Sequence, residues 1–314
     1  MPEKRCHICL KPIETAESGI YHDDCCKALF NAFEPPDLPY TWNDLNALAK
    51  KVVRRHVTVP GVQPKLSLHL EGGHAGTERL TLVGMEGGYI LKLPVEQYPE
   101  MPELEHLSMR LARLFGIETC ECGLISLSDG QTAFIARRMD RIEGQKRHME
   151  DMCQLTDRLT ERKYSGSLEQ VGKAILQYCD NALFDALRFF ELLIFCFLTG
   201  NADMHLKNFS LIYDPGGEVR LSPAYDLLPT ALLLPQDQEE SALTINGKKR
   251  KLDGDDFRSL ARSLTLNDKQ IDNAFARFSE RLEAAYGLLE DGLCSQAAKK
   301  RFVRLIETRG TLLA

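Results

Sequence analysis

The sequence predicts an α+β protein with two unequal lobes, the first rich in strands and the second rich in helices. In the first half, short segments alternate apolar and polar residues and are separated by glycine-rich turns. From about residue 145 onward, apolar residues recur mostly at helical spacing. Segregation of strands from helices along the chain is typical of an α+β fold.

The predicted strands lie mainly in the first half of the chain. They cover 65–70, 79–83, 89–94, 122–127 and 131–140. The turns EGGHAG and MEGG separate the first three, which predicts an antiparallel meander.

The predicted helices begin after a proline-rich linker at 34–43. In the helix at 103–115, leucines recur at helical spacing and Gly116 ends the element. The full set covers 43–54, 103–115, 167–178, 181–199, 255–263, 267–290 and 296–308.

Composition limits the classes of function. The chain has 314 residues, of which 44% are hydrophobic, so it can bury a sizeable core. Its net charge of −6 provides no overall basic field for nucleic acid or an anionic membrane. The longest apolar run, 192–198, is too short to span a bilayer, and the start MPEKRCHIC lacks the apolar region of a signal peptide. We therefore expect a compact cytoplasmic protein that does not enter a membrane.

Cysteines cluster only near the start of the chain. Cys6, Cys9, His22 and Cys25 follow the pattern C-x2-C-x12-H-x2-C, which suits a closed tetrahedral zinc site. Such a short segment lacks the apolar area to fold unaided, which favours structural Zn²⁺. Cys26 is the alternative fourth ligand, and free structural thiols are the alternative to zinc.

Polar residues crowd the end of the most apolar predicted helix. This apolar run ends at Gly200, and the polar residues that follow include Asp203, His205, Lys207 and Asn208. Further along, Asp226 stands between apolar neighbours in SPAYDLLP. Oxygen ligands and a nearby carboxylate are what magnesium and an attacking hydroxyl require. The alternative is that Asp and Asn act as caps and turn residues, and a lone His205 more often packs than acts as a base.

A lysine in an apolar strand is a second candidate for phosphate chemistry, in addition to the polar residues after the apolar helix. Lys92 lies in YILKLP, where an ammonium must be paired because its burial is otherwise costly. Glu105 in the following helix is the natural partner, and protein kinases use such a strand lysine and helix glutamate to bind phosphates. Upstream, TVPGVQPK places Gly61 in a turn where backbone N–H groups can approach phosphates.

Together, these motifs resemble the HipA family of bacterial serine/threonine kinases from about residue 57 onward. The stretches that carry the resemblance are GVQPKLSL, YILKLP, ELEHLSMRLARLFGI, RRMDR, EDMCQL, GNADMHLKNFS and PAYDLLP. The resemblance implies a bilobal protein-kinase-like fold that uses ATP with Mg²⁺. It also implies a toxin that phosphorylates an aminoacyl-tRNA synthetase and is restrained by an antitoxin partner.

The resemblance assigns roles to individual residues. It implies that Asp203 is the catalytic base, that Asn208 and Asp226 are metal ligands, that Lys92 binds phosphate, and that Lys207 helps to hold the γ-phosphate. The remaining nucleotide-site residues that it implies are Pro60, Gly61, Val62, Gln63, Pro64, Lys65, Glu105, Arg137, Met139 and His205. The stretch from Arg137 to Met139 corresponds to the lobe hinge and replaces the Glu-Arg-Phe of relatives, which leaves backbone contacts to the adenine.

The chain also departs from the family in two ways. Its first 56 residues hold the zinc-knuckle segment and a helix instead of a further N-terminal subdomain, so it looks like the short HipT form. In three-component HipBST systems, that subdomain is a separate small protein. Relatives autophosphorylate a serine before the phosphate loop, where this chain has Thr58; Ser67 is a poorer candidate.

These observations divide the chain into three predicted segments. Residues 1–42 form the zinc-knuckle segment and linker, 43–140 the strand-rich lobe with the phosphate loop, and 141–314 the helical lobe with the catalytic and metal-binding loops. The predicted function is ATP-dependent phosphorylation of a protein serine or threonine.

Two other classes of function remain. The first is a catalytically silent kinase-fold module that binds a partner. The second is nucleic-acid binding through the basic runs at 248–251 and 299–301, but no set of stacking aromatic residues accompanies them. We expect DNA to be reached only indirectly, through an antitoxin with a helix-turn-helix domain.

Overall fold

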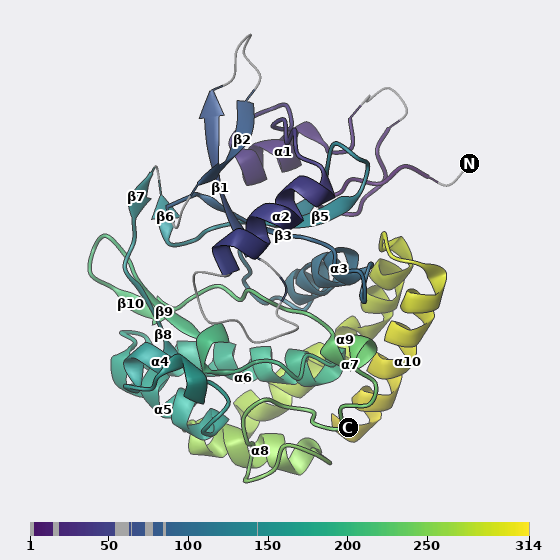
Figure 1. Ribbon diagram of the computed structural model, residues 1–314. Coiled ribbons are helices and arrows are strands. Elements are labelled where there is room, and N and C mark those ends of the chain that lie inside the picture. Colours follow the sequence, from purple (N-terminus) through teal and green to yellow (C-terminus); the bar gives the residue numbers. More distant parts are fainter. Residues whose placement is uncertain are drawn as a thin grey trace. The chain divides into compact units, whose positions relative to one another are not determined.

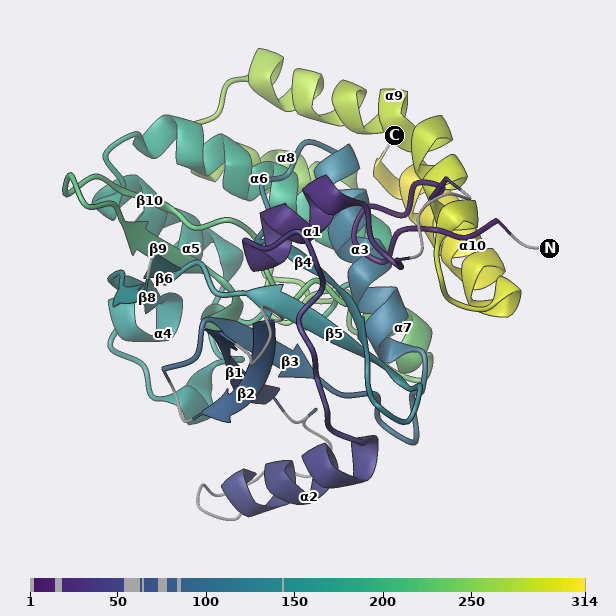
Figure 2. The same cartoon turned by 90° about the horizontal axis from the view of Figure 1, so that it is seen from above.

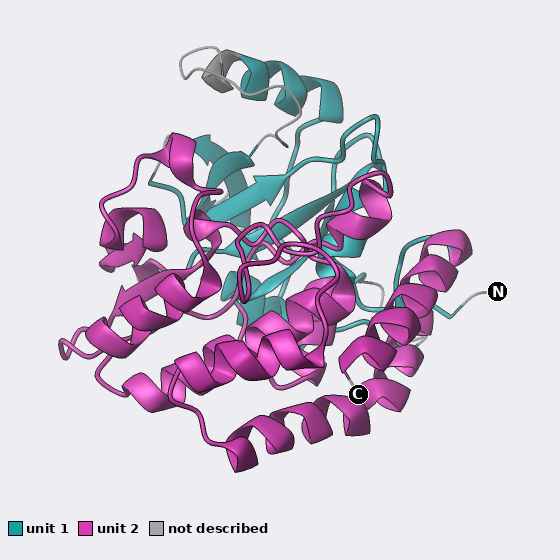
Figure 3. Cartoon of the chain, turned by 90° about the horizontal axis from the view of Figure 1, so that it is seen from below, with its two compact units in different colours: residues 1–107, 120–138, 291–295 teal, residues 108–119, 139–290, 296–314 magenta. Residues whose placement is uncertain are grey.

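The computed structural model of the chain describes residues 3–14, 19–53, 63, 65–72, 78–83, 86–142 and 144–313. Two compact units are present, each assembled from segments that are distant in sequence (Figure 3). Unit 1 comprises Met1–Leu107, Cys120–Arg138 and Asp291–Ser295, and unit 2 comprises Ser108–Thr119, Met139–Glu290 and Gln296–Ala314. Strands dominate unit 1 and helices dominate unit 2, so the predicted α+β fold is confirmed.

Unit 1 contains a five-stranded sheet with the order β2-β1-β3-β5-β4 (Figures 1 and 2). Every neighbouring pair in it is antiparallel. The strands are β1 Lys65–Gly72, β2 Glu78–Val83, β3 Tyr89–Lys92, β4 Cys122–Ser126 and β5 Thr132–Arg137. All five were predicted from the sequence, with boundaries shifted by a few residues.

The predicted meander is wrong in its strand order. β3 pairs with β1, with Leu68 opposite Tyr89 and Lys65 opposite Lys92, and it does not pair with β2. The connection from β2 to β3 therefore passes β1. There the N–H of Gly87 donates to Ser67 Oγ at 3.1 Å. A Cβ at Gly87 would lie 2.3 Å from the carbonyl oxygen of Leu68, so the close approach requires glycine.

Unit 1 also contains helices on the N-terminal side of the chain. These are α1 Asp23–Phe30, α2 Trp42–Val53 and the first half of α3 Met101–Leu114. The sequence predicted α2 and α3, but it did not predict α1. One hydrophobic cluster joins Leu29 and Phe30 of α1, Leu45 of α2 and Leu91 of β3, so the N-terminal segment shares the core of the sheet.

Unit 2 is built around the apolar helix α6, Ala182–Thr199, which packs against α5 and α10. The other helices of this unit are α4 Met152–Leu155, α5 Leu168–Tyr178, α7 Thr230–Leu233, α8 Gly254–Ser263, α9 Asp268–Asp291 and α10 Gln296–Leu313. Asp291, the last residue of α9, belongs to unit 1. α10 begins where the sequence predicted and extends the predicted helix at 296–308 to Leu313.

Unit 2 also holds short strands that the sequence did not predict. A three-stranded antiparallel sheet has the order β10-β9-β8, and β6 pairs with β7. Their bounds are β6 Arg141–Ile142, β7 Gln145–Lys146, β8 Met149–Asp151, β9 Ser210–Tyr213 and β10 Val219–Leu221. Strands of two to four residues are too short to display an alternating pattern. Within the described ranges, every helix is too short or too polar to cross a membrane.

Candidate active site

The polar loop of unit 2 begins where α6 ends. Gly200 caps the helix with a φ of +76°, and a Cβ there would lie 2.6 Å from Leu305 Cδ2, which favours glycine. The N–H of the next residue, Asn201, donates back to the carbonyl oxygen of Cys196 at 2.8 Å. Asn201 is buried, and this hydrogen bond fixes the start of the polar loop to the end of α6.

Hydrogen bonds within the loop fix its backbone. Asn208 Nδ2 donates to the carbonyl oxygen of Asp203 at 3.0 Å, and the N–H of His205 donates to the same oxygen at 2.8 Å. Asn201 Oδ1 accepts from the N–H of Asp203 at 3.2 Å. Because these bonds use the backbone of Asp203, its carboxylate remains available for other contacts.

That carboxylate contacts a tyrosine that the sequence did not predict for the site. Tyr164 Oη donates to Asp203 Oδ1 at 2.9 Å. Burial raises the pKa of Tyr164, and the negative charge of Asp203 raises it further, so the phenol stays protonated and donates. Tyr164 is 46% exposed and therefore lies at the surface of unit 2.

The neighbouring residue Lys163 contacts the other ionisable side chain of the loop. Lys163 Nζ lies 2.9 Å from His205 Nε2, and the carbonyl oxygen of Lys163 accepts from the N–H of Leu206 at 3.1 Å. Burial lowers the pKa of His205, and the charge of Lys163 acts in the same direction, although Asp203 opposes it. The ring is therefore neutral at physiological pH, and Nε2 accepts from the ammonium. His205 Nδ1 is buried without a hydrogen-bond partner among the described residues, so a bound ligand could satisfy it.

Asp226 lies in an irregular segment that hydrogen bonds connect to this loop. Its φ of +61° is in the left-handed region, which aspartate adopts more readily than most residues other than glycine. Asn201 Nδ2 donates to the carbonyl oxygen of Asp226 at 3.5 Å, and Tyr225 Oη donates to that of Lys207 at 2.9 Å. Asp203, Asn208 and Asp226 are the residues predicted as base and metal ligands. In unit 2 they lie on loops that these hydrogen bonds connect.

Lys207 has a partner that the sequence did not indicate. Its Nζ lies 2.5 Å from Asp151 Oδ2, and the other carboxylate oxygen of Asp151 accepts from the N–H of Gln154 at 3.0 Å to cap α4. The predicted contact of Lys207 with a γ-phosphate stays a prediction.

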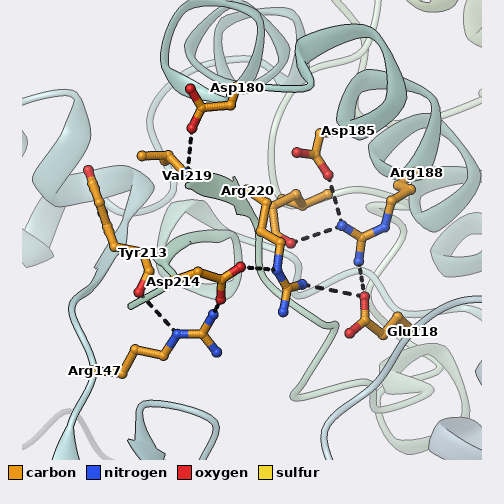
Figure 4. Close-up of polar contacts among 10 residues, drawn as sticks. Glu118, Arg147, Asp180, Asp185, Arg188, Tyr213, Asp214, Val219 and Arg220 are labelled. Atoms are coloured by element: carbon orange, nitrogen blue, oxygen red, sulfur yellow. Dashed lines mark hydrogen bonds and ion pairs between the residues drawn. The ribbon is translucent and has the colours of Figure 1, made fainter. Parts of the chain in front are cut away.

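Charged side chains brace the β9–β10 hairpin, which joins the loop of Asn208 to that of Asp226 (Figure 4). Arg188 of α6 contacts Glu118 at 2.6 Å and donates to the carbonyl oxygen of Leu221 at 3.0 Å. Arg147 and Arg220 both contact Asp214 between the two strands. The network therefore fixes the hairpin against α6, and with it the spacing of the two loops.

In unit 1, the predicted ion pair between Lys92 and Glu105 is present. Lys92 Nζ donates to Glu105 Oε1, and both residues are buried, with exposures of 5% and 1%. The ammonium also lies 5.4 Å from the centroid of the Phe134 ring. β3 thus presents a lysine that is held in place by a glutamate of α3.

The other predicted nucleotide-site residues are described only in part. Gln63 is buried, and its Nε2 donates to the carbonyl oxygen of Leu93, next to Lys92, at 2.8 Å. Lys65 begins β1, Arg137 ends β5, and Met139 is the first residue of the second segment of unit 2. The residues that lie outside the described part of the chain are Thr58, Pro60, Gly61, Val62 and Pro64.

The four N-terminal residues predicted to bind zinc lie together in unit 1. The ligand atoms of Cys6, Cys9, His22 and Cys25 are all within 4.8 Å of one another. His22 Nδ1 lies 3.3 Å from Cys9 Sγ and 3.9 Å from Cys25 Sγ. These distances bracket the edge of about 3.6 Å that zinc–sulfur and zinc–nitrogen bonds give in a tetrahedron.

The surroundings of the cluster also fit zinc. His22 Nε2 lies 2.9 Å from the carbonyl oxygen of Pro12, and this contact directs Nδ1 toward the sulfurs, as a hydrogen bond to the far ring nitrogen commonly does at zinc sites. Cys26, the alternative ligand, is not among the residues whose ligand atoms lie within 4.8 Å of one another, whereas Cys25 is. The donor set therefore favours Cys25 over Cys26.

Comparison with known proteins relates this chain to proteins named as kinases. Residues 57–286 match the family model described as HipA-like C-terminal domain. A protein of Haemophilus influenzae named "Putative kinase" is 31% identical over 295 residues, which cover 85% of this chain and 84% of the relative. The chain spans 59% and 57% of the length of two further curated relatives.

Two solved structures share the fold. The Shewanella oneidensis HipA in a complex with HipB and operator DNA superposes with a TM-score of 0.64 at 22% identity, covering 84% of this chain and 69% of that chain. The Helicobacter pylori proinflammatory kinase CtkA gives a TM-score of 0.54 at 16% identity, covering 74% and 90%. At these identities the likeness shows a kinase-like fold, as predicted, and no more.

Proposed function

Because the chain belongs to the HipA-like C-terminal domain family, we propose that it is an ATP-dependent serine/threonine protein kinase. The observation that carries this proposal is the anchored loop that holds Asp203 beside Asn208, with the backbone of Asp226 hydrogen-bonded to Asn201 of the same loop.

Each residue has a stated part in the proposed reaction. Asp203 takes the proton of the acceptor hydroxyl, and Asn208 and Asp226 would hold magnesium through their oxygen atoms. Lys92, kept in place by Glu105, would bind phosphate oxygens. When bound, magnesium neutralises charge on the triphosphate.

The other predicted assignments are part of the same proposal. The loop from Pro60 to Lys65 would approach the phosphates, the backbone from Arg137 to Met139 would meet the adenine, and Thr58 is the candidate for autophosphorylation. The proposal keeps the three predicted segments, 1–42, 43–140 and 141–314, as functional parts.

We further propose that the kinase is the toxin of a toxin–antitoxin system. The solved complex of a HipA with HipB and operator DNA supports an antitoxin partner, through which DNA would be reached indirectly. As the short HipT form, the chain would also have a small separate partner in place of the N-terminal subdomain. The proposed acceptor is an aminoacyl-tRNA synthetase or a similar translation protein.

Phosphate transfer from radiolabelled ATP tests the kinase proposal. We expect the wild-type chain to label itself or an added acceptor. Asp203→Asn should lose at least about 100-fold in rate, since general-base catalysis contributes that much, and Asp226→Asn should also lose most of its activity because it removes a charged ligand of magnesium. Asp237→Asn, at an exposed site in unit 2, is the matched control and should retain the wild-type rate.

Equal background labelling by the wild type and Asp203→Asn, with matching thermal unfolding, would instead favour the silent binding module.

A second experiment identifies the acceptor by phosphoproteomics after induced expression, with Asp226→Asn as the comparison. A dominant phosphopeptide from a synthetase would support the toxin proposal, whereas a wild-type phosphoproteome identical to that of Asp226→Asn would contradict it.

A further inference from the structure

The N-terminal knuckle, defined here as residues 4–14 and 19–30, contacts both elements that carry the Lys92–Glu105 pair. All of these elements belong to unit 1: the knuckle, β3, β4 and residues 101–107 of α3. The contacts come from residues within five positions of the four predicted zinc ligands.

The contact with α3 is made by the neighbour of Glu105. His106 Nε2 lies 2.9 Å from the carbonyl oxygen of Ile8, and a carbonyl only accepts, so the histidine donates. Both residues are buried, with exposures of 1% and 3%. Ile8 stands between Cys6 and Cys9, so the zinc-ligand turn itself supplies the acceptor for α3.

The contact with β3 is made by α1, which carries Cys25. Tyr89 at the start of β3 donates through Oη to the carbonyl oxygen of Leu29 at 3.2 Å. The rings of Phe30 and Tyr89 have centroids 5.9 Å apart. Since Lys92 is the last residue of this four-residue strand, the packing of α1 helps to set the position of the lysine.

The contact with β4 closes this arrangement. The N–H of Leu124 donates to the carbonyl oxygen of His7 at 2.9 Å, and Tyr21 Oη donates to that of Leu124 at 2.7 Å. A Cβ at Gly123 would lie 2.8 Å from Ile8 Cγ1, so the knuckle packs directly on the strand. The knuckle therefore touches α3, β3 and β4 through buried backbone groups.

The knuckle has few means of holding this shape by itself. Ile8, Ile13 and Tyr21 pack into the hydrophobic cluster of the sheet, but residues 4–14 form no named helix or strand, so the turn that carries Cys6 and Cys9 would depend on its metal for a fixed shape. Three thiolates and an imidazole select zinc among common divalent ions. Without the metal, the carbonyl oxygens of His7 and Ile8 would no longer be fixed where β4 and α3 need them.

We propose that zinc bound by Cys6, Cys9, His22 and Cys25 positions α3 against β3 and thereby holds Glu105 on Lys92. The knuckle is in this sense a metal-dependent brace for the ion pair. Only its last consequence, an effect on ATP use, rests on the proposed kinase function, because the lysine–glutamate pair of kinases must be in place for activity.

Metal analysis and hydrogen exchange on the full chain test the brace. We expect about one zinc per chain by mass spectrometry of the metal. Removal of zinc with a chelator should raise deuterium uptake at 19–30 and also at 89–92 and 101–107, while 182–199 of α6 in unit 2 stays unchanged. Adding zinc back should restore the original uptake. A chain purified without zinc, or an increase confined to the knuckle, would overturn the proposal.

His106→Leu distinguishes a specific link between the knuckle and α3 from a general loss of structure in the knuckle. His106→Leu keeps all four ligands, so it should retain zinc, but uptake at 101–107 should already be high and should no longer respond to the chelator. Cys26→Ala, adjacent to a ligand, should retain both zinc and the chelator response. A His106→Leu chain that behaves like wild type at 101–107 would contradict the assigned link.

The effect on ATP is measured last. If the chain is a kinase, His106→Leu should raise the KM for ATP more than it lowers kcat, since the lysine is displaced and Asp203 is not. Should the chain prove inactive, the zinc content and the exchange data still decide whether the brace exists.

Discussion

Tyr164 places a hydroxyl group on the carboxylate that is proposed as the base. Its distance of 2.9 Å from Asp203 Oδ1 is what an acceptor serine or threonine would need for its own proton to be taken. The phenol remains protonated because burial and Asp203 raise its pKa. If Asp203 is the base, as proposed, Tyr164 would compete with the acceptor for the same oxygen atom.

Removing this hydroxyl should release the competition. We expect Tyr164→Phe to raise the rate of ATP hydrolysis, with water as the acceptor, by about fivefold, since a partly exposed hydrogen bond of this kind is worth about 1 kcal/mol. Release of ADP at saturating ATP is the measurement. Tyr213→Phe is the matched control, because Tyr213 also donates to a carboxylate at 2.6 Å, but to that of Glu150 and not to that of Asp203.

A lower rate in Tyr164→Phe than in Tyr213→Phe would mean that the tyrosine orients Asp203 instead of blocking it. An unchanged rate in both variants would show that the contact has no role in the reaction.

At this scale, the sequence predicted residues whose chemistry is conspicuous locally. A lysine in an apolar strand demands a partner, and the nearby helix offered Glu105, so that pair could be predicted. The contacts of Lys163 and Tyr164 with the loop could not, because they join side chains that are 42 and 39 positions apart in the chain and follow no local pattern. The partner of Lys207 was missed for the same reason, since Asp151 lies 56 positions away.

At the scale of elements, the path from β2 to β3 shows how a small residue permits a topology. Gly87 lies so close to β1 that a side chain at this position would overlap the carbonyl oxygen of Leu68. Glycine therefore allows the β2–β3 connection to pass β1. Gly88, the next residue, has open space where a Cβ would be. The two glycines therefore form a natural pair for comparison.

We expect Gly87→Ala to destabilise the chain by about 1–3 kcal/mol, because a methyl group would overlap the carbonyl oxygen of Leu68. Gly88→Ala should lie close to wild type. Thermal unfolding followed by circular dichroism measures both, and a fall of several degrees in Tm is expected only for Gly87→Ala. Equal Tm values for the two variants would show that the β2–β3 connection does not pass β1 as closely as described.

The existence of most elements could be predicted, whereas their pairing could not. Alternation identified each strand of the five-stranded sheet, but it does not say which neighbour a strand chooses, and the meander was therefore wrong. α1 escaped prediction because its eight residues carry only three buried positions. The strands β8, β9 and β10 were missed because each is shorter than the pattern that would identify it.

At the scale of the whole molecule, residues that are far apart in the sequence belong to the same compact unit. Unit 1 takes in Asp291–Ser295, far along the chain, where Asp291 contacts Arg5 at 2.7 Å and Ser295 Oγ donates to Glu100 at 3.0 Å. No compositional change marks such a short return segment, so it could not be predicted. The three contiguous segments predicted from the sequence stay a prediction.

Each unit has a core of its own, which predicts local effects of core substitutions. Leu29 in unit 1 and Leu260 in unit 2 are both fully buried, and truncation of a buried leucine to alanine costs about 2–5 kcal/mol. Because compact units open as cooperative subunits of a structure, we expect Leu29→Ala to raise hydrogen exchange at 65–72, 89–92 and 122–126 but not at 168–178. Leu260→Ala, in α8, should do the reverse. If either substitution raised exchange in all of these segments equally, the chain would behave as one cooperative unit and the separation of the cores would have no energetic meaning.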